Sequence, residues 1–181
     1  IGDIARQFGI PLHLDGARLS NAQAATGATL AELTWKAGVD AVSFGGTKNG
    51  LIGAEAVVLF DPTKAWEFEL RRKRAGHLFS KHRFLSAQMA AYLKNDLWIE
   101  LAQQANASAK RLAEGLAKVD GVSLMHPVDA NMIFFEMSAA QHRCMLAAGA
   151  VYGVMSSTPR ADCADDAVLP ARWVCSWSTT D

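Results

Sequence analysis

The sequence predicts an α/β protein: part of a large domain with a mostly parallel sheet and flanking helices, followed by a small α+β C-terminal domain. Three observations predict this class. Helical and strand-like patterns alternate over residues 1–60, which favours right-handed crossovers between parallel strands. Apolar residues then recur every three or four positions over residues 97–119, as in a long amphipathic helix. Two strand-like runs, a helix and a third apolar run follow it, as in a small α+β domain.

The first third of the chain predicts five elements. Gly9 stops the first helical pattern, and Pro11 starts an extended run. The third strand is closed by Asp61 and Pro62. We expect helices over residues 1–8 and 29–37, and strands over residues 12–14, 40–44 and 51–60.

The rest of the chain predicts mostly helices and then a second group of strands. We expect helices over residues 63–74, 80–93, 97–119 and 139–148, strands over residues 121–125, 131–137 and 172–177, and a polar loop over residues 158–166. A long amphipathic helix commonly bridges two domains. We therefore expect one domain over residues 1–95 and a second over residues 96–181, made of the bridging helix and the small C-terminal domain.

Composition and charge argue for small partner molecules. The 181 residues are 50% apolar with a formal net charge of zero, so no electrostatic footprint for nucleic acid or an anionic membrane is expected. No apolar run approaches the roughly 20 residues of a membrane span, and a cytoplasmic location is expected. The 3 cysteines show no C-x-x-C spacing, so we expect neither a zinc site nor a disulfide framework.

A lysine and a carboxylate each follow a predicted strand. Lys48 stands in DAVSFGGTKNG, where an apolar run ends in a Gly-rich turn, and Asp15 ends the apolar run in IPLHLDGARL. Their separation is about the length of one strand–helix–strand crossover, so both can face one cleft at the carboxyl edge of the sheet. Taken alone, Lys48 is more typical of a surface hairpin lysine, and the upstream Asp15 segment is what favours the Schiff-base role.

This pair suits pyridoxal phosphate. The amine of Lys48 would form the Schiff base that holds the cofactor. The carboxylate of Asp15 would keep the ring nitrogen protonated, since a nearby opposite charge favours the charged form. The protonated ring is an electron sink. Ala17 is small enough to lie flat against the ring, although an ordinary small residue in a tight turn is an equal reading of it.

Three segments carry a resemblance to a known family. HLDGARL (residues 13–19), VSFGGTKNG (42–50) and RRKRAGHLFSKHRFLSAQMAAYL (71–93) resemble the low-specificity L-threonine aldolases, in the β-eliminating lyase group of fold type I pyridoxal-phosphate enzymes. The resemblance covers most of residues 1–136 and returns at ARWVCSW (171–177).

The resemblance implies roles and an activity. Lys48 matches the Schiff-base lysine, Asp15 the partner of the ring nitrogen and Ala17 the ring-packing position. Arg18 and Arg172 match two arginines that bind the substrate carboxylate, which agrees with the bidentate bonds that guanidinium groups form. The implied reaction cleaves L-threonine, L-allo-threonine and related β-hydroxy-α-amino acids to glycine and an aldehyde. A homo-oligomer, dimer or tetramer, with active sites at the subunit interface is also implied.

The sequence departs from the family pattern at its start. The family's phosphate-binding loop, ring-stacking side chain and candidate base for the β-hydroxyl would all precede Ile1, and no G-x-G-x-x-G or P-loop pattern replaces them. We therefore expect a piece of a longer protein, incomplete for activity alone, and residues 147–170 also fit the family poorly. Two alternatives stay open: another fold type I lyase or transferase acting on small amino acids, and a catalytically silent fragment with a structural role.

The basic run Arg71–Arg74, with Lys81 and Arg83, has two readings. It could be a solvated helix face; the resemblance implies that it lies near a subunit interface, where a basic residue could reach a neighbour's cofactor phosphate. Sparse aromatic residues and the balanced overall charge argue against a nucleic-acid patch.

Overall fold

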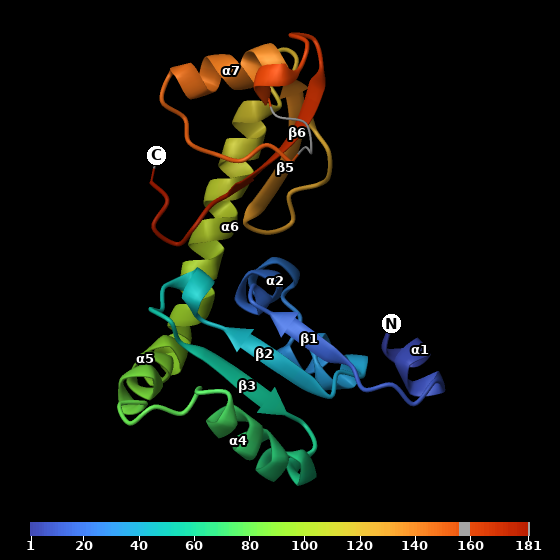
Figure 1. Ribbon diagram of the computed structural model, residues 1–181, viewed down its shortest axis with the longest axis vertical. Helices are drawn as coiled ribbons and strands as arrows, with labels where there is room; N and C mark the ends of the chain where they lie inside the picture. The colour runs from blue at the N-terminus through green and yellow to red at the C-terminus, as the bar shows by residue number, and fades with distance from the viewer. Residues whose placement is uncertain (156–159, 181) are drawn as a thin grey trace. The chain divides into compact units, whose positions relative to one another are not determined.

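Two separate three-stranded sheets form the framework of the chain (Figure 1). The computed structural model describes residues 1–155 and 160–180, and it divides into two units, Ile1–Gln103 and Gln104–Asp181. The first sheet has the order β1-β2-β3 and lies in unit 1, and the second has the order β4-β5-β6 and lies in unit 2.

Unit 1 alternates short helices with short strands. Its strands are β1 (His13–Gly16), β2 (Ala41–Gly45) and β3 (Glu55–Leu59). Its α-helices are α1 (Gly2–Gln7), α2 (Leu19–Thr26), α3 (Leu30–Leu33), α4 (Ala65–Arg74) and α5 (Arg83–Leu93). Its 3-10 helices are η1 (Trp35–Ala37), η2 (Thr47–Asn49), η3 (Pro62–Lys64) and η4 (Lys94–Asp96). α6 (Leu97–Leu116) begins in this unit.

The pairing of the first sheet differs in part from the prediction. β1 and β2 are parallel, as expected from the intervening helices. β3 is antiparallel to β2, so the described sheet is mixed and the expectation of a mostly parallel sheet is wrong for it. The reason is the short connection from Gly45 to Glu55, since a parallel crossover needs about a dozen residues or more.

The pleat of β2 separates an apolar face from a polar one. Val42 and Phe44 are buried, and with Leu19, Tyr92 and Trp98 they form the core of unit 1. The ring of Phe44 lies edge-on to that of Trp98, with centroids 5.7 Å apart. Ser43 points to the opposite face, because successive side chains of a strand alternate. One face of this sheet is therefore available for polar chemistry.

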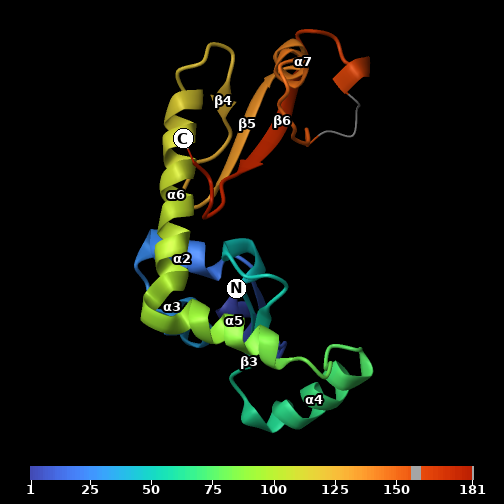
Figure 2. The same ribbon diagram turned by 90° about the vertical axis from the view of Figure 1, so that its left-hand side faces the viewer.

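Unit 2 is an antiparallel sheet with helices around it. It contains the remainder of α6, β4 (Ser123–Leu124), β5 (Met132–Ser138), α7 (Ala139–Ala147), η5 (Arg160–Asp162) and β6 (Val168–Val174). Figure 2 shows the C-terminal part of α6 running alongside these strands. Ala109 and Ala113 of α6 are buried in one cluster with Ile133, Phe135 and Met137 of β5.

Capping and sheet position explain two features of unit 2. α7 begins with a capping box: the Ser138 hydroxyl accepts a hydrogen bond from the Gln141 amide, and the Gln141 side chain accepts one from the Ser138 amide. β6 starts four residues before the expected strand. Pro170 lies inside β6, and it is tolerated because β6 is at the end of the strand order. The first two residues of the expected polar loop, 158 and 159, lie outside the described residues.

Candidate active site

The turns that follow β1 and β2 meet at one edge of the first sheet. Asp15 is opposite Ser43 in the parallel register, so both strands run out toward the same edge. A Cβ built on Gly45 would lie 2.7 Å from the Cα of Ala17, which leaves no room for a side chain between the two turns. Gly45, the first residue of GGTKNG, therefore allows direct backbone contact with the Asp15–Arg18 turn.

Asp15 is exposed on the polar face of the sheet. Its carboxylate accepts a hydrogen bond of 3.0 Å from the amide of Ala17, which holds the turn. His13 lies two residues earlier on the same face, and its Nε2 is 2.9 Å from Oγ of Ser43. Sequence reasoning missed His13 and Ser43, although the period of two along each strand places both beside Asp15. The face thus offers a carboxylate, an imidazole and a hydroxyl.

Lys48 is exposed at the middle of η2, and its neighbour Asn49 is buried. The Asn49 amide donates to the Tyr92 hydroxyl at 2.6 Å and to the Trp98 carbonyl at 2.8 Å. On the other side of Lys48, the amide of Thr47 donates to the Glu55 carboxylate at 3.2 Å. The exposed side chain of Lys48 therefore extends from a turn that hydrogen bonds fix on both sides of it.

Tyr92 contacts the Lys48 turn through Asn49 and is fully buried. Its hydroxyl is 2.9 Å from Oγ of Ser20, the second residue of α2. Burial raises the pKa of Tyr92, and the hydrogen bonds to Ser20 and Asn49 oppose that rise. The phenol is therefore neutral at physiological pH and acts as a hydrogen-bonding group.

The structure brings four of the five predicted site residues to one edge: Asp15, Ala17, Arg18 and Lys48. Arg18 is partly buried and directly precedes α2, three residues after Asp15. Arg172 belongs to unit 2, where it is exposed near the middle of β6, opposite Phe134.

These residues fit the ring of pyridoxal phosphate. A ring bound at this edge would find an amine at Lys48, a carboxylate at Asp15, and small residues at Ala17 and Gly45 where a larger side chain would occupy the space. Phosphate anchoring is a separate need, and no phosphate-binding motif was found in the sequence.

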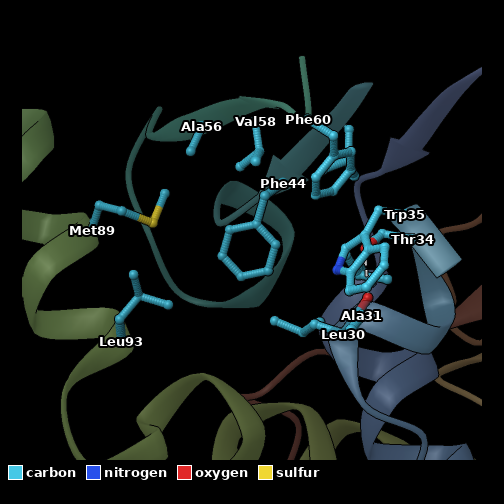
Figure 3. Close-up of a pocket in the computed structure, with 12 residues that line it drawn as sticks. Leu30, Ala31, Thr34, Trp35, Phe44, Ala56, Val58, Phe60, Met89 and Leu93 are labelled. Atoms are coloured by element: carbon cyan, nitrogen blue, oxygen red, sulfur yellow. Dashed lines mark hydrogen bonds between the residues drawn. The ribbon is translucent and has the colours of Figure 1, made fainter. Parts of the chain in front are cut away.

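An apolar pocket of about 350 Å³ lies on the other face of the same sheet (Figure 3). Phe44, Ala56 and Val58 approach it from β2 and β3, as Met89 and Leu93 do from α5. The hydroxyl of Thr34 also reaches it, but it is hydrogen-bonded to the carbonyl of Leu30. Apart from Thr34 the lining is apolar, and the polar side chains of His13, Asp15 and Ser43 are on the opposite face of the sheet.

The basic run of α4 is partly paired within its own helix. Arg71 contacts Glu67 at 2.5 Å and Arg72 contacts Glu69 at 2.9 Å. The hydrogen bond from Arg71 lowers the pKa of the exposed Glu67 carboxyl. These i,i+4 and i,i+3 pairs are typical of a solvated helix face.

The described residues contain no candidate metal site and no helix able to span a membrane. No group of three or more His, Cys, Asp or Glu side chains there could hold a metal ion. Over the same residues, every helix is too short or too polar to cross a membrane.

Comparison with known proteins gives consistent matches. A family model described as beta-eliminating lyase matches residues 1–140. The low-specificity L-threonine aldolase of Pseudomonas aeruginosa is 42% identical over 179 residues, which are 99% of this chain and 49% of that protein. The enzyme of the same name from a Pseudomonas species is 41% identical over 182 residues, with 100% of this chain and 49% of that protein covered.

A solved structure also matches the whole chain. The threonine aldolase of Leishmania major superposes with a TM-score of 0.80 at 25% identity, over 99% of this chain and 50% of that one. The chain thus spans about half the length of the relatives it matches.

Proposed function

This chain belongs to the beta-eliminating lyase family, and from that premise we propose that the protein is a pyridoxal-phosphate-dependent aldolase. Its substrates are L-threonine, L-allo-threonine and related β-hydroxy-α-amino acids, and its products are glycine and an aldehyde. The observation that carries the proposal is the meeting of the Lys48 and Asp15 turns at one sheet edge through the contact of Gly45 with Ala17. That arrangement presents an amine and a carboxylate to a single flat ligand.

Each site residue has a defined task in this proposal. Lys48 binds the cofactor covalently through its amine, and Asp15 holds a proton on the ring nitrogen by charge attraction. When bound, pyridoxal phosphate accepts into its ring the electron pair of the Cα–Cβ bond that breaks. Ala17 packs against the ring.

Two arginines orient the substrate. Arg18 and Arg172 bind the carboxylate of the amino acid by charge-assisted, bidentate hydrogen bonds. Binding by two guanidinium groups fixes the rotation about the bond between the Cα atom and the amino nitrogen of the substrate. It thereby selects the Cα–Cβ bond as the one that breaks.

The wider organisation follows the same proposal. Residues 1–95 are the C-terminal part of the cofactor-binding large domain, and residues 96–181 are the bridging helix and the small C-terminal domain. Groups outside this chain complete the phosphate site. A cytoplasmic homo-oligomer, dimer or tetramer, stays a prediction from the sequence resemblance.

The test is the visible absorbance of the full-length protein after addition of pyridoxal phosphate. We expect a band that is lost in Lys48→Ala and kept in Lys64→Ala, a matched change of another exposed lysine in a 3-10 helix of unit 1. Addition of glycine should shift the band, and L-threonine should yield glycine. A protein without a Lys48-dependent band would overturn the proposal; a band with no cleavage of threonine would point to another lyase or transferase.

A further inference from the structure

A buried series of hydrogen bonds connects the Asp15–Arg18 turn and the Lys48 turn on the core side of the sheet edge. It runs from Ser20 through the Tyr92 hydroxyl to the Asn49 amide, over contacts of 2.9 and 2.6 Å. Ser20, Asn49 and Tyr92 have exposed fractions of 1%, 2% and 0%. Buried polar groups are retained when they are hydrogen-bonded, so this chain is a specific structural connection between distant segments.

The ends of this chain lie next to the residues proposed to act. Ser20 is in the first turn of α2, directly after the Asp15–Arg18 turn. Asn49 is the residue after Lys48 in η2. Tyr92 belongs to α5, a third element, and its ring packs on Phe44 of β2 with centroids 6.1 Å apart. A single hydroxyl thus contacts both segments.

The direction of the bond between Asn49 and Tyr92 is fixed, because an amide nitrogen can only donate. The Asn49 amide uses its two N–H groups, one to the Tyr92 oxygen and one to the Trp98 carbonyl. The Tyr92 oxygen accepts from Asn49, and its own hydrogen can be donated to Ser20. Phenylalanine at this position would keep the ring and remove both contacts of the hydroxyl.

We propose that Tyr92 is a positioning residue, whose hydroxyl fixes the separation of the Lys48 turn from the Asp15–Arg18 turn. This inference rests on the proposed function, since the separation matters because one ring must reach both side chains. Gly45 and Ala17 set the contact of the turns at the sheet edge, and the hydroxyl of Tyr92 sets their spacing in the core. Without the hydroxyl, the two turns keep their fold but lose their fixed spacing.

The experiment compares Tyr92→Phe with Tyr152→Phe in the full-length protein. Tyr152 is the matched control, because its partly buried hydroxyl also bonds to a buried side chain, Nδ1 of His142 at 2.9 Å, in unit 2. Two quantities are measured: the dissociation constant of pyridoxal phosphate, and the rate at which borohydride fixes saturating cofactor onto Lys48, located by peptide mass. The second reports the placement of the lysine and needs no turnover.

We expect Tyr92→Phe to weaken cofactor binding roughly tenfold, because both hydrogen bonds of the hydroxyl are lost, and to slow fixation at Lys48. Tyr152→Phe should leave cofactor binding and the fixation rate unchanged. The two variants should lower the unfolding midpoint by similar amounts. The inference is overturned if the two variants differ only in unfolding midpoint or not at all. If the wild-type protein itself fixes no cofactor at Lys48, the proposed function fails instead.

A second variant tests whether the chain acts as a unit. Ser20→Ala removes the other end of the same connection and is a smaller change in the core. We expect it to slow fixation at Lys48 in the same direction, and the double variant with Tyr92→Phe to be no slower than Tyr92→Phe alone, since groups in one network are not additive. Purely additive slowing would contradict a shared connection. Should Tyr92→Phe fail to fold, unaltered fixation in Ser20→Ala would overturn the inference.

Discussion

Lys48 and Arg172 are both exposed basic side chains, but the chain holds them in different ways. Lys48 lies on a one-turn 3-10 helix that is fixed by a few specific contacts, through Asn49, Glu55 and the packing of Gly45. Arg172 lies inside a seven-residue strand that is paired along its whole length with β5. Unit 1 therefore positions a side chain by individual bonds, and unit 2 by a repeated ladder.

The difference teaches which substitutions separate stability from site geometry. A ladder has many equivalent hydrogen bonds, so losing one neighbour alters the free energy of unfolding but leaves the strand in register. A turn fixed by single contacts can shift while the core stays intact. We therefore expect changes in the core of unit 2 to act on stability, and changes beneath the turns of unit 1 to act on cofactor binding as well.

The largest effect on stability is expected from Phe135→Ala. Phe135 is fully buried in β5, and its ring meets that of Trp173 with centroids 4.6 Å apart. Removing it should lower the free energy of unfolding by about 3–5 kcal/mol, from lost burial and the cavity left behind. Chemical denaturation measures this, with the exposed Phe8→Ala as control. A change in cofactor affinity of the folded variant would break the comparison.

Gly45→Ala should have the next largest effect and should reach the site. The added methyl group would collide with the backbone of Ala17, which we expect to cost about 1–3 kcal/mol and to weaken cofactor binding. Gly115→Ala is the matched change, because a Cβ at Gly115 in α6 meets nothing within 4 Å. It should raise helix stability by about 0.5–1 kcal/mol. Equal effects of the two on cofactor binding would refute the distinction between turn and helix.

A smaller effect, on pH dependence, sharpens the comparison. Burial raises the pKa of the Cys175 thiol above its ordinary value of 9.0 and that of the Tyr92 phenol above 10.0. Both groups hold their proton longer in the folded protein, so their stabilising contributions are complete below these values and are lost as pH rises through the raised ones. Denaturation midpoints over an alkaline pH series should fall, beginning with unit 2. Cys175→Ala should remove the part that starts near pH 9, and an unchanged slope in that variant would contradict the assignment.

The smallest effect on stability is expected from Arg172→Ala. Its side chain is exposed and its backbone stays in the β5–β6 ladder, so the free energy of unfolding should change by less than about 0.5 kcal/mol. In the full-length protein, its proposed contact with the substrate predicts a higher KM for threonine if the proposed function holds. Arg172→Lys should restore little, since an ammonium group lacks the bidentate geometry. A large loss of stability would show that the side chain supports the sheet.

Periodic patterns predicted much of the fold. The repeat from Leu97 marked α6, and alternating or continuous apolar runs marked β2 and β5. α2 was missed because it begins at Leu19 directly after the DGAR turn, with Arg18 at its N-cap and no capping side chain. The direction of β3 was also missed, since it depends on the length of a connection more than on the strand itself.

The candidate site was predictable only where the sequence is local. DGAR and GGTKNG are each an unbroken run of residues, so each can be recognised in the sequence. The parallel pairing of the strands before them follows from the helices between them. The support beneath them is not local. Ser20, Asn49 and Tyr92 each look like an ordinary polar residue in the sequence, and only the packing of three elements joins them.

The contact between Gly45 and Ala17 also limits how this protein can be redesigned. If the proposed function holds, Gly45 at the end of β2 and Ala17 in the turn after β1 are the positions where extra space beside the cofactor would first be sought. Because a Cβ at Gly45 would lie 2.7 Å from the Cα of Ala17, any substitution of Gly45 would push the two turns apart, and most such variants should be inactive. A library that keeps both small and diversifies the polar face at His13 and Ser43 would sample new substrates without rebuilding the scaffold.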